Sequence, residues 1–173
     1  MAKTINVLIA FDASSIKRDI SNPSKNPDQP TSVGSQYIYM TTRHDHVVNS
    51  SSGANLDFEA NPGDTIRWRE TTLSLNADYS ALLYAYVSSD PDHKLLEDPR
   101  VSIVEGSFPI PKEGVGGKPD YDRQSYNDHF WTALVKKSDA SGITYHFSFQ
   151  IHDDEGNLVG YFKWDPHITI KPR

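Results

Sequence analysis

The segment GITYHFSFQIH, residues 142–152, alternates apolar and polar side chains more regularly than any other part of the chain. One parity is entirely apolar and consists of Ile143, Tyr145, Phe147, Phe149 and Ile151. Successive side chains of a β-strand point to opposite faces, so this pattern predicts a strand with one face in a core. The segment therefore favours a fold built from β-sheets.

Other segments extend this pattern. Residues 5–11 place four apolar side chains on one face: Ile5, Val7, Ile9 and Phe11. Residues 79–87 and 130–135 are apolar on both parities, which is typical of strands covered on both sides, and we expect them to be inner strands. No window shows a sustained helical stripe, and the 10 Gly and 11 Pro residues cluster between the strand candidates.

The recurrence of strands separated by turns predicts a single all-β domain over residues 1–173. We expect an antiparallel β-sandwich of roughly eight to ten strands with little helix. Two long loops are expected at residues 21–35 and 108–124, where Gly, Pro and polar residues accumulate. The sequence DDEGN at residues 153–157 predicts a hairpin turn in which Gly156 adopts a positive φ.

The composition limits the classes of function. The chain has 173 residues and a formal net charge of -6, and it contains no block of Lys or Arg, which argues against nucleic-acid binding. The absence of cysteine excludes disulfides, thiolate metal sites and thiol catalysis. The N-terminal stretch lacks the features of a secretion signal, and no apolar run approaches about 18 residues. We therefore expect a cytoplasmic protein that does not insert into membranes.

The stretch PGDTIRWRE, residues 62–70, begins with turn residues and continues as a strand. Trp68 shares its parity with Ile66 and is expected to point into the core. Arg67 and Arg69 take the opposite face, where arginines two residues apart more often pair with carboxylates on a neighbouring strand. The alternative is that these arginines hold a ligand.

Three runs of the chain resemble the PixA/AidA family of bacterial inclusion-body proteins. They are INVLIAFDASSIKRDISNPSKNPDQPTS at residues 5–32, NLDFEANPGDTIRWRETTLSLNADYSALLY at 55–84 and GYFKWDPHITI at 160–170. The runs keep the family order over nearly the whole chain, although residues 91–123 match least. The resemblance implies a β-sandwich made by host-associated bacteria, able to accumulate as crystalline cytoplasmic inclusions, with lectin-like sugar binding as its leading activity and no enzymatic role.

Carbohydrate binding needs convergent hydrogen-bonding groups and an aromatic face for the sugar ring. The segment YNDHFW, residues 126–131, places Asn127, Asp128 and His129 close to Trp131 at the end of the second expected loop. We predict that these four residues bind a glycan. The alternative is a loop that leads into a core strand, with the tryptophan buried.

Asn76 and Asp78 are a second candidate for the glycan surface. They lie at a turn between two expected strands, and the family resemblance adds weight to this position. The alternative is that both side chains stabilise the turn itself, as Asn and Asp commonly do.

His44, Asp45 and His46 form the third candidate. Both histidines would share one face of a strand, where the three residues could contribute to a polar ligand surface. One alternative is that they are solvated residues at a strand end. Another is a zinc site, for which a third ligand would come from elsewhere in the chain: His129, His146 or His152.

Asp12 and Asn22 follow the first expected strand within the first family-like run. Oxygens from adjacent loops can coordinate calcium, a frequent helper in sugar recognition, but calcium needs six to eight oxygen ligands, which only the folded chain could bring together. We therefore predict that no cofactor is required and that calcium, if bound, uses these residues.

Catalysis finds little support, because the sequence contains none of the GxSxG, HExxH, GxGxxG or P-loop patterns. The resulting hypothesis is a non-enzymatic, lectin-like protein that binds host or microbial surface glycans, self-associates as a homo-oligomer and accumulates in cytoplasmic inclusions. The alternative hypothesis is a structural or storage protein of inclusions that does not bind sugar.

Overall fold

The computed structural model describes residues 2–47, 53–54, 56–112, 120–137, 143–164, 167–168 and 170–171. The strands are β1 (Thr4–Phe11), β2 (Thr31–Ser32), β3 (Ile38–Thr41), β4 (Phe58–Glu59), β5 (Thr65–Thr72), β6 (Tyr79–Ser88), β7 (Arg100–Pro111), β8 (Tyr121–Leu134), β9 (Ile143–Asp153), β10 (Leu158–Lys163), β11 (His167–Ile168) and β12 (Ile170–Lys171). The short helical elements are α1 (Ala13–Asp19) and the 3-10 turns η1 (Ser35–Tyr37) and η2 (His44–His46). Strands dominate, so the prediction of an all-β fold with little helix is confirmed.

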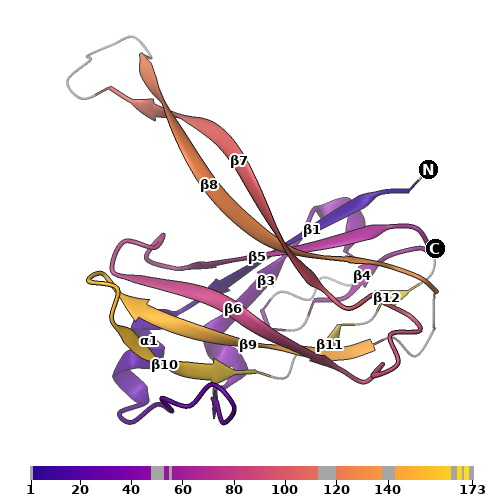
Figure 1. Cartoon of the computed structure of the whole chain (residues 1–173), viewed down its shortest axis with the longest axis horizontal. Helices are drawn as coiled ribbons and strands as arrows, with labels where there is room; N and C mark the ends of the chain where they lie inside the picture. The colour runs from indigo at the N-terminus through magenta and orange to yellow at the C-terminus, as the bar shows by residue number, and fades with distance from the viewer. Residues whose placement is uncertain are drawn as a thin grey trace.

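Most strands belong to two sheets (Figure 1). The first sheet has the order β3-β1-β5-β8-β7. In the second sheet β9 lies between β6 and β10, while β2 pairs with β10 and β11 pairs with the start of β9. A separate pair joins β12 to β4.

The expectation of a purely antiparallel arrangement is wrong. β1 pairs with β5 in parallel over its whole length, and the short pairs β10 with β2 and β12 with β4 are parallel as well. Parallel neighbours require a crossover connection, and the segment between β1 and β5 supplies one that contains α1 and β3. Side-chain alternation is the same in both arrangements, so the sequence pattern does not reveal strand direction.

The two sheets face each other across an aromatic core. Phe11 of β1 stacks on Phe149 of β9 with ring centroids 4.0 Å apart. Trp68 of β5 is fully buried, packs against Tyr145 and Phe147, and donates its Nε1–H to the Tyr145 hydroxyl at 2.6 Å. The inward parity predicted for residues 142–152 is confirmed in β9, and the inward direction predicted for Trp68 is confirmed in β5.

The second expected loop is a long β-hairpin, so this prediction is wrong. β7 and β8 pair continuously from Arg100 and Thr132 to Pro111 and Tyr121, and they project from the body of the protein (Figure 1). Two prolines in β7 suggested a loop, but proline is compatible with an edge strand because its missing N–H can face the unpaired side. The central part of the expected loop, residues 113–119, lies outside the described residues.

We call the projecting part of this hairpin, residues 102–111 and 121–130, the arm. β8 pairs with β5 only through residues 131–134, so the strand leaves the first sheet where the arm begins. The inner position expected for residues 130–135 is confirmed for the part of β8 that lies between β5 and β7.

Residues 79–87 do not form an inner strand. They lie in β6, which pairs with β9, and within the described residues no strand pairs with its other edge. The register of β6 shifts between Leu83 and Ala85, so Tyr84 and Tyr86 lie on opposite sides of the sheet although they have the same parity. Tyr86 contacts Tyr145 and Phe147 in the core, while Tyr84 contacts Tyr161 on the outer face.

Two further connections, residues 21–35 and 153–157, lie against or next to β10. Within residues 21–35, Ser24 forms a bridge with Tyr161, and the Lys25 ammonium donates to the carbonyl oxygens of Leu158 and Val159. The first long loop is therefore attached to β10. Residues 153–157 form the expected turn between β9 and β10, and Gly156 has a φ of 82°.

Candidate functional site

The outer face of the first sheet contains a cavity of about 440 Å³. Because Trp68 points into the core, its neighbours Arg67 and Arg69 point outward from β5 and line this cavity. Phe130 and Asp128 of β8 lie beside them, and Leu8 of β1 contributes to the opposite wall. A cavity of this size lies within the range of small-molecule sites in proteins.

The Arg67 side chain lies over the ring of Phe130, with 4.5 Å between its guanidinium carbon and the ring centroid. Its Nε is buried and has no hydrogen-bond partner among the described residues. Cation–π contact contributes about 0.5–1 kcal/mol at exposed sites and more where water is excluded. The contact holds the guanidinium group in place but does not neutralise its charge.

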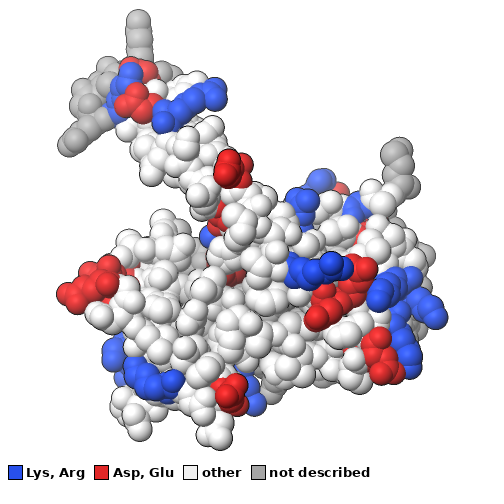
Figure 2. All heavy atoms as spheres, in the orientation of Figure 1, with Lys and Arg blue, Asp and Glu red and all other residues white. Residues whose placement is uncertain are grey.

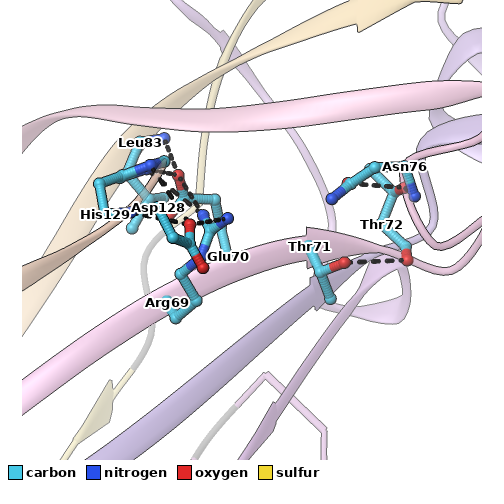
Figure 3. Close-up of polar contacts among 8 residues, drawn as sticks. All are labelled: Arg69, Glu70, Thr71, Thr72, Asn76, Leu83, Asp128 and His129. Atoms are coloured by element: carbon cyan, nitrogen blue, oxygen red, sulfur yellow. Dashed lines mark hydrogen bonds and ion pairs between the residues drawn. The ribbon is translucent and has the colours of Figure 1, made fainter. Parts of the chain in front are cut away.

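Arg69 is paired with acidic groups. Its Nη2 lies 2.5 Å from Asp128 Oδ1, and its Nη1 lies 3.5 Å from Glu70 Oε1. Figure 3 shows Arg69 and Asp128 converging on the side chains of Glu70 and His129. The predicted pairing of the two arginines with carboxylates of a neighbouring strand is therefore confirmed for Arg69, whereas among the described residues no such pair forms with Arg67.

The Glu70 side chain is fully buried and connects the two sheets. Its Oε1 lies 2.5 Å from His129 Nε2 and accepts a hydrogen bond from the Leu83 backbone N–H at 3.4 Å (Figure 3). His129 belongs to β8 at the base of the arm, whereas Leu83 belongs to β6 of the second sheet. Glu70 therefore links β5, β8 and β6. Its other oxygen, Oε2, is buried without a partner among the described residues.

The four residues predicted from residues 126–131 lie on β8 instead of a loop and do not form one group. Asp128 and His129 line the cavity. Asn127 lines a separate hollow on the arm, beside Glu105 and Tyr126. Trp131 turns toward the core and packs against Phe147 with ring centroids 5.6 Å apart, which corresponds to the structural alternative for this tryptophan.

Asn76 and Asp78 lie in the turn between β5 and β6. Asn76 has a positive φ of 61°, and its backbone N–H donates to the hydroxyl of Thr72 at 3.0 Å. Figure 3 shows Thr72 and Asn76 apart from the Arg69 and Glu70 cluster. These contacts stabilise the turn, and sugar binding by the two residues stays a prediction.

The HDH sequence forms the 3-10 turn η2 and not a strand, so the expected shared strand face for the histidines is wrong. Asp45 pairs with Arg43 at 2.9 Å, and Arg43 also lines the cavity. His46 is buried, whereas His44 is exposed. In the described part of the chain, no three His, Asp or Glu side chains stand close enough together to hold a metal ion.

Asp12 has a local structural role. Its Oδ1 accepts a hydrogen bond from the Ser15 backbone N–H at 3.0 Å and caps the N-terminus of α1. Such capping contributes about 1 kcal/mol to helix stability. Asn22 lies in a bend after α1. Calcium binding by Asp12 and Asn22 stays a prediction.

Sequence reasoning missed Glu70, which closes the cluster behind the cavity. A signal for it is present, because Glu70 has the parity of Ile66 and Trp68 and would therefore be expected to point into the core. A carboxylate at an inward position requires a partner. The identity of that partner depends on the pairing of β5 with β8, which is a property of the folded chain.

Two mixed sheets, an aromatic core and a projecting hairpin define the class of this protein as an all-β protein with an open pocket on one sheet. The family model described as PixA, inclusion body protein, matches residues 3–170, and the chain belongs to this family. The predicted family resemblance is therefore confirmed.

The chain is also similar to a solved structure, the crystal structure of an inclusion body protein (PixA) from Burkholderia cenocepacia J2315. The TM-score is 0.78 with 24% sequence identity, and the alignment covers 98% of this chain and 96% of that one. At this identity the likeness concerns the fold alone. A search of curated proteins finds no significant match. Within the described residues, the helices are too short and too polar to cross a membrane.

Proposed function

We propose that this protein is a non-enzymatic component of cytoplasmic inclusions and that it self-associates through the arm. The main observation is the arm itself, a two-stranded ribbon that extends away from the core (Figure 1). An isolated two-stranded hairpin is at best marginally stable in water, and additional strands or packing are needed to stabilise it. The arm is therefore expected to pack against a partner.

Apolar side chains are exposed along the arm, from its base to its tip. Ile103 is 70% exposed, Tyr121 52% and Phe108 45%. Figure 2 shows that the middle of the arm is largely uncharged on the visible face and that charged side chains gather near its tip. Exposed apolar surface of this kind is typical of an association site.

Several features favour a second copy of the same chain as the partner. Within the described residues, β7 pairs with β8 alone, and β8 has no neighbour on its other side beyond Trp131. The free edge of β8 can therefore accept a further strand, whereas the two prolines of β7 remove backbone N–H donors from that strand. The tip contains both signs of charge, with Lys112 close to Asp120 and Asp122, so a cation of one arm can face a carboxylate of the other. A symmetric contact uses the same surface on both copies.

The test is the molar mass in solution, measured by light scattering after size-exclusion chromatography. The wild-type protein is expected to form a dimer or larger species, and Phe108→Lys or Ile103→Lys is expected to shift it toward the monomer. Leu75→Lys is the matched control, because Leu75 is 85% exposed in the turn between β5 and β6. Monomeric wild-type protein at all concentrations, or oligomers that tolerate both arm variants, would contradict the proposal.

A second candidate function is glycan binding at the cavity. It is supported by Asp128 and His129, which line the cavity together with Phe130 and Leu8 and so provide polar groups and apolar surface for a sugar. The experiment is a glycan array with and without calcium, using wild-type protein and Asp128→Ala. Binding that is lost in the variant would favour this function, and the absence of any bound glycan in both conditions would count against it.

A further inference from the structure

Among the described residues that line the cavity on the first sheet, Arg67 is a cation without an anionic partner. Arg43 pairs with Asp45, and Arg69 pairs with Asp128. Within the described residues, no carboxylate forms an ion pair with Arg67, although its side chain is half-buried. A charge held partly out of water is unfavourable without compensation. Binding of an anion next to Arg67 therefore lowers the free energy of the site.

The Glu70 and His129 pair does not supply that anion. Glu70 Oε1 faces His129 Nε2, the Leu83 N–H and Arg69 Nη1, and its contacts lie in the interior behind the cavity. The side chain is fully buried, and its Oε1 is engaged with these donors. Among the described residues, Arg67 therefore remains the lining cation that no carboxylate pairs with.

The orientation of Arg67 suits a planar anion. Its stacking on Phe130 limits rotation of the side chain, so the N–H groups at the guanidinium edge are already directed. Arginine forms two parallel hydrogen bonds with a carboxylate, and such bidentate pairs are among the stronger contacts in proteins. A single uncompensated positive charge matches a carboxylate better than a doubly charged phosphate.

The remaining walls indicate what the carboxylate is attached to. Leu8 and Phe130 supply apolar surface, while Asn6 and Thr41 add polar groups on β1 and β3. The cavity of about 440 Å³ fits a ligand of one or two rings. We propose that this cavity binds a small ring compound bearing a carboxylate, with Arg67 as the residue that binds the carboxylate.

Two sources share this chemistry: an acidic sugar, such as a uronic acid, and a non-sugar aromatic acid. The first source rests on the second candidate function above, because it specifies the glycan. The second source is independent of glycan binding. Neither depends on self-association through the arm, so the ligand and the arm can be tested separately.

The experiment is isothermal titration calorimetry with glucuronate and benzoate as probes. Glucose and benzyl alcohol serve as their neutral counterparts, and inorganic phosphate serves as a generic anion. We expect at least one carboxylate to bind roughly tenfold to hundredfold more tightly than its neutral counterpart, as a charge-assisted hydrogen bond implies. Glucuronate alone would assign the site to acidic sugars and benzoate alone to aromatic acids. Either result, or binding of both, supports the proposal.

Variants locate the binding to Arg67. Arg67→Gln is expected to remove the preference for the carboxylate, and Arg67→Lys to retain part of it, because lysine keeps the charge but not the bidentate geometry. Arg18→Gln is the control, since Arg18 is an exposed arginine of α1. Circular dichroism and light scattering on each variant separate loss of binding from loss of fold or of self-association.

Three outcomes would overturn the proposal. The first is that neither carboxylate binds to folded wild-type protein. The second is equal affinity for the carboxylates and their neutral counterparts, and the third is phosphate binding as tight as that of the best carboxylate. Unchanged carboxylate affinity in folded Arg67→Gln would likewise contradict the role of Arg67.

Discussion

Glu70 combines full burial with a charged functional group. Its carboxylate contacts His129 and Arg69 on the side of the cavity and the backbone of Leu83 in the other sheet. All three donors share this one buried acceptor. Loss of the carboxylate would leave each donor without its hydrogen-bond partner. The cluster is therefore a structural connection between the base of the arm and the body.

We predict that Glu70→Ala lowers the free energy of unfolding by about 3 kcal/mol, the low end for breaking a buried ion pair. The value lies at the low end because Arg69 and His129 keep partial contact with water, with 34% and 20% of their side chains exposed. Urea unfolding followed by tryptophan fluorescence would measure the change. Glu105→Ala, an exposed arm residue, is the control, and a loss no greater than that of the control would contradict the prediction.

At the scale of elements, two buried aspartates organise the loops between strands. Asp64 accepts hydrogen bonds from the backbone N–H groups of Lys3 and Asn61 just before β5. Asp90 accepts three, from Lys94, Leu95 and Leu96, after β6. These bonds stabilise backbone donors that no strand pairing satisfies.

The two carboxylates predict a loss of stability in acid. Burial opposes ionisation of both groups, but their hydrogen bonds to backbone N–H groups outweigh it, so the pKa of Asp64 and of Asp90 lies below the ordinary value of 3.8. Because the pKa is lower in the folded state, the resulting stability is present above pH 3.8 and is lost as the pH falls through the folded-state values.

Thermal unfolding at a series of pH values would measure this effect. We expect the melting temperature to fall as the pH is lowered below 3.8, with a smaller fall for Asp90→Asn, which no longer titrates at this position. Asp78→Asn, an exposed aspartate in the turn between β5 and β6, is the matched control. Equal acid dependence in the wild-type protein and Asp90→Asn would show that Asp90 does not contribute.

At the scale of the whole molecule, the body and the arm differ in what stabilises them. The body buries an aromatic core between two sheets, whereas the arm is a two-stranded ribbon with exposed apolar side chains. A second copy that covers the arm binds the folded chain and not the unfolded one. Such binding raises the apparent stability with protein concentration.

We therefore predict that the melting temperature of the wild-type protein rises by a few degrees when the protein concentration increases about a hundredfold. Differential scanning calorimetry would measure this dependence. Phe108→Lys should reduce it and Leu75→Lys should leave it unchanged. A melting temperature that is independent of concentration would argue against association through the arm.

Much of the fold follows from local pattern. The alternation in residues 142–152, the inward Trp68 and the turn at residues 153–157 are properties of neighbouring side chains, and the structure confirms each of them. Predictions from local pattern were wrong where the structure of a segment depends on the strand that pairs with it. The prolines of β7 suggested a loop, and the apolar β6 suggested an inner strand, because neither pattern indicates which strand lies alongside.

The candidate site was predicted only in part, for the same reason. Asp128 and His129 were selected by their chemistry and do line the cavity, but Asn127 lines a hollow on the arm and Trp131 packs against Phe147 in the core. These positions depend on how β8 pairs with β5 and β7. Arg67 was recognised as outward-facing, while its contact with Phe130 depends on the register between β5 and β8.

The sequence by itself determined the β class, the inward faces of the strands, the main turns and the family, since all of these depend on the order and spacing of side chains. Only the tertiary structure decided the parallel pairing of β1 with β5, the projection of the arm and the position of Arg67 over Phe130 in the cavity. These features depend on which segments pair although they lie far apart in the sequence. The free energy of that pairing comes from contacts between the segments, which no single stretch of sequence contains.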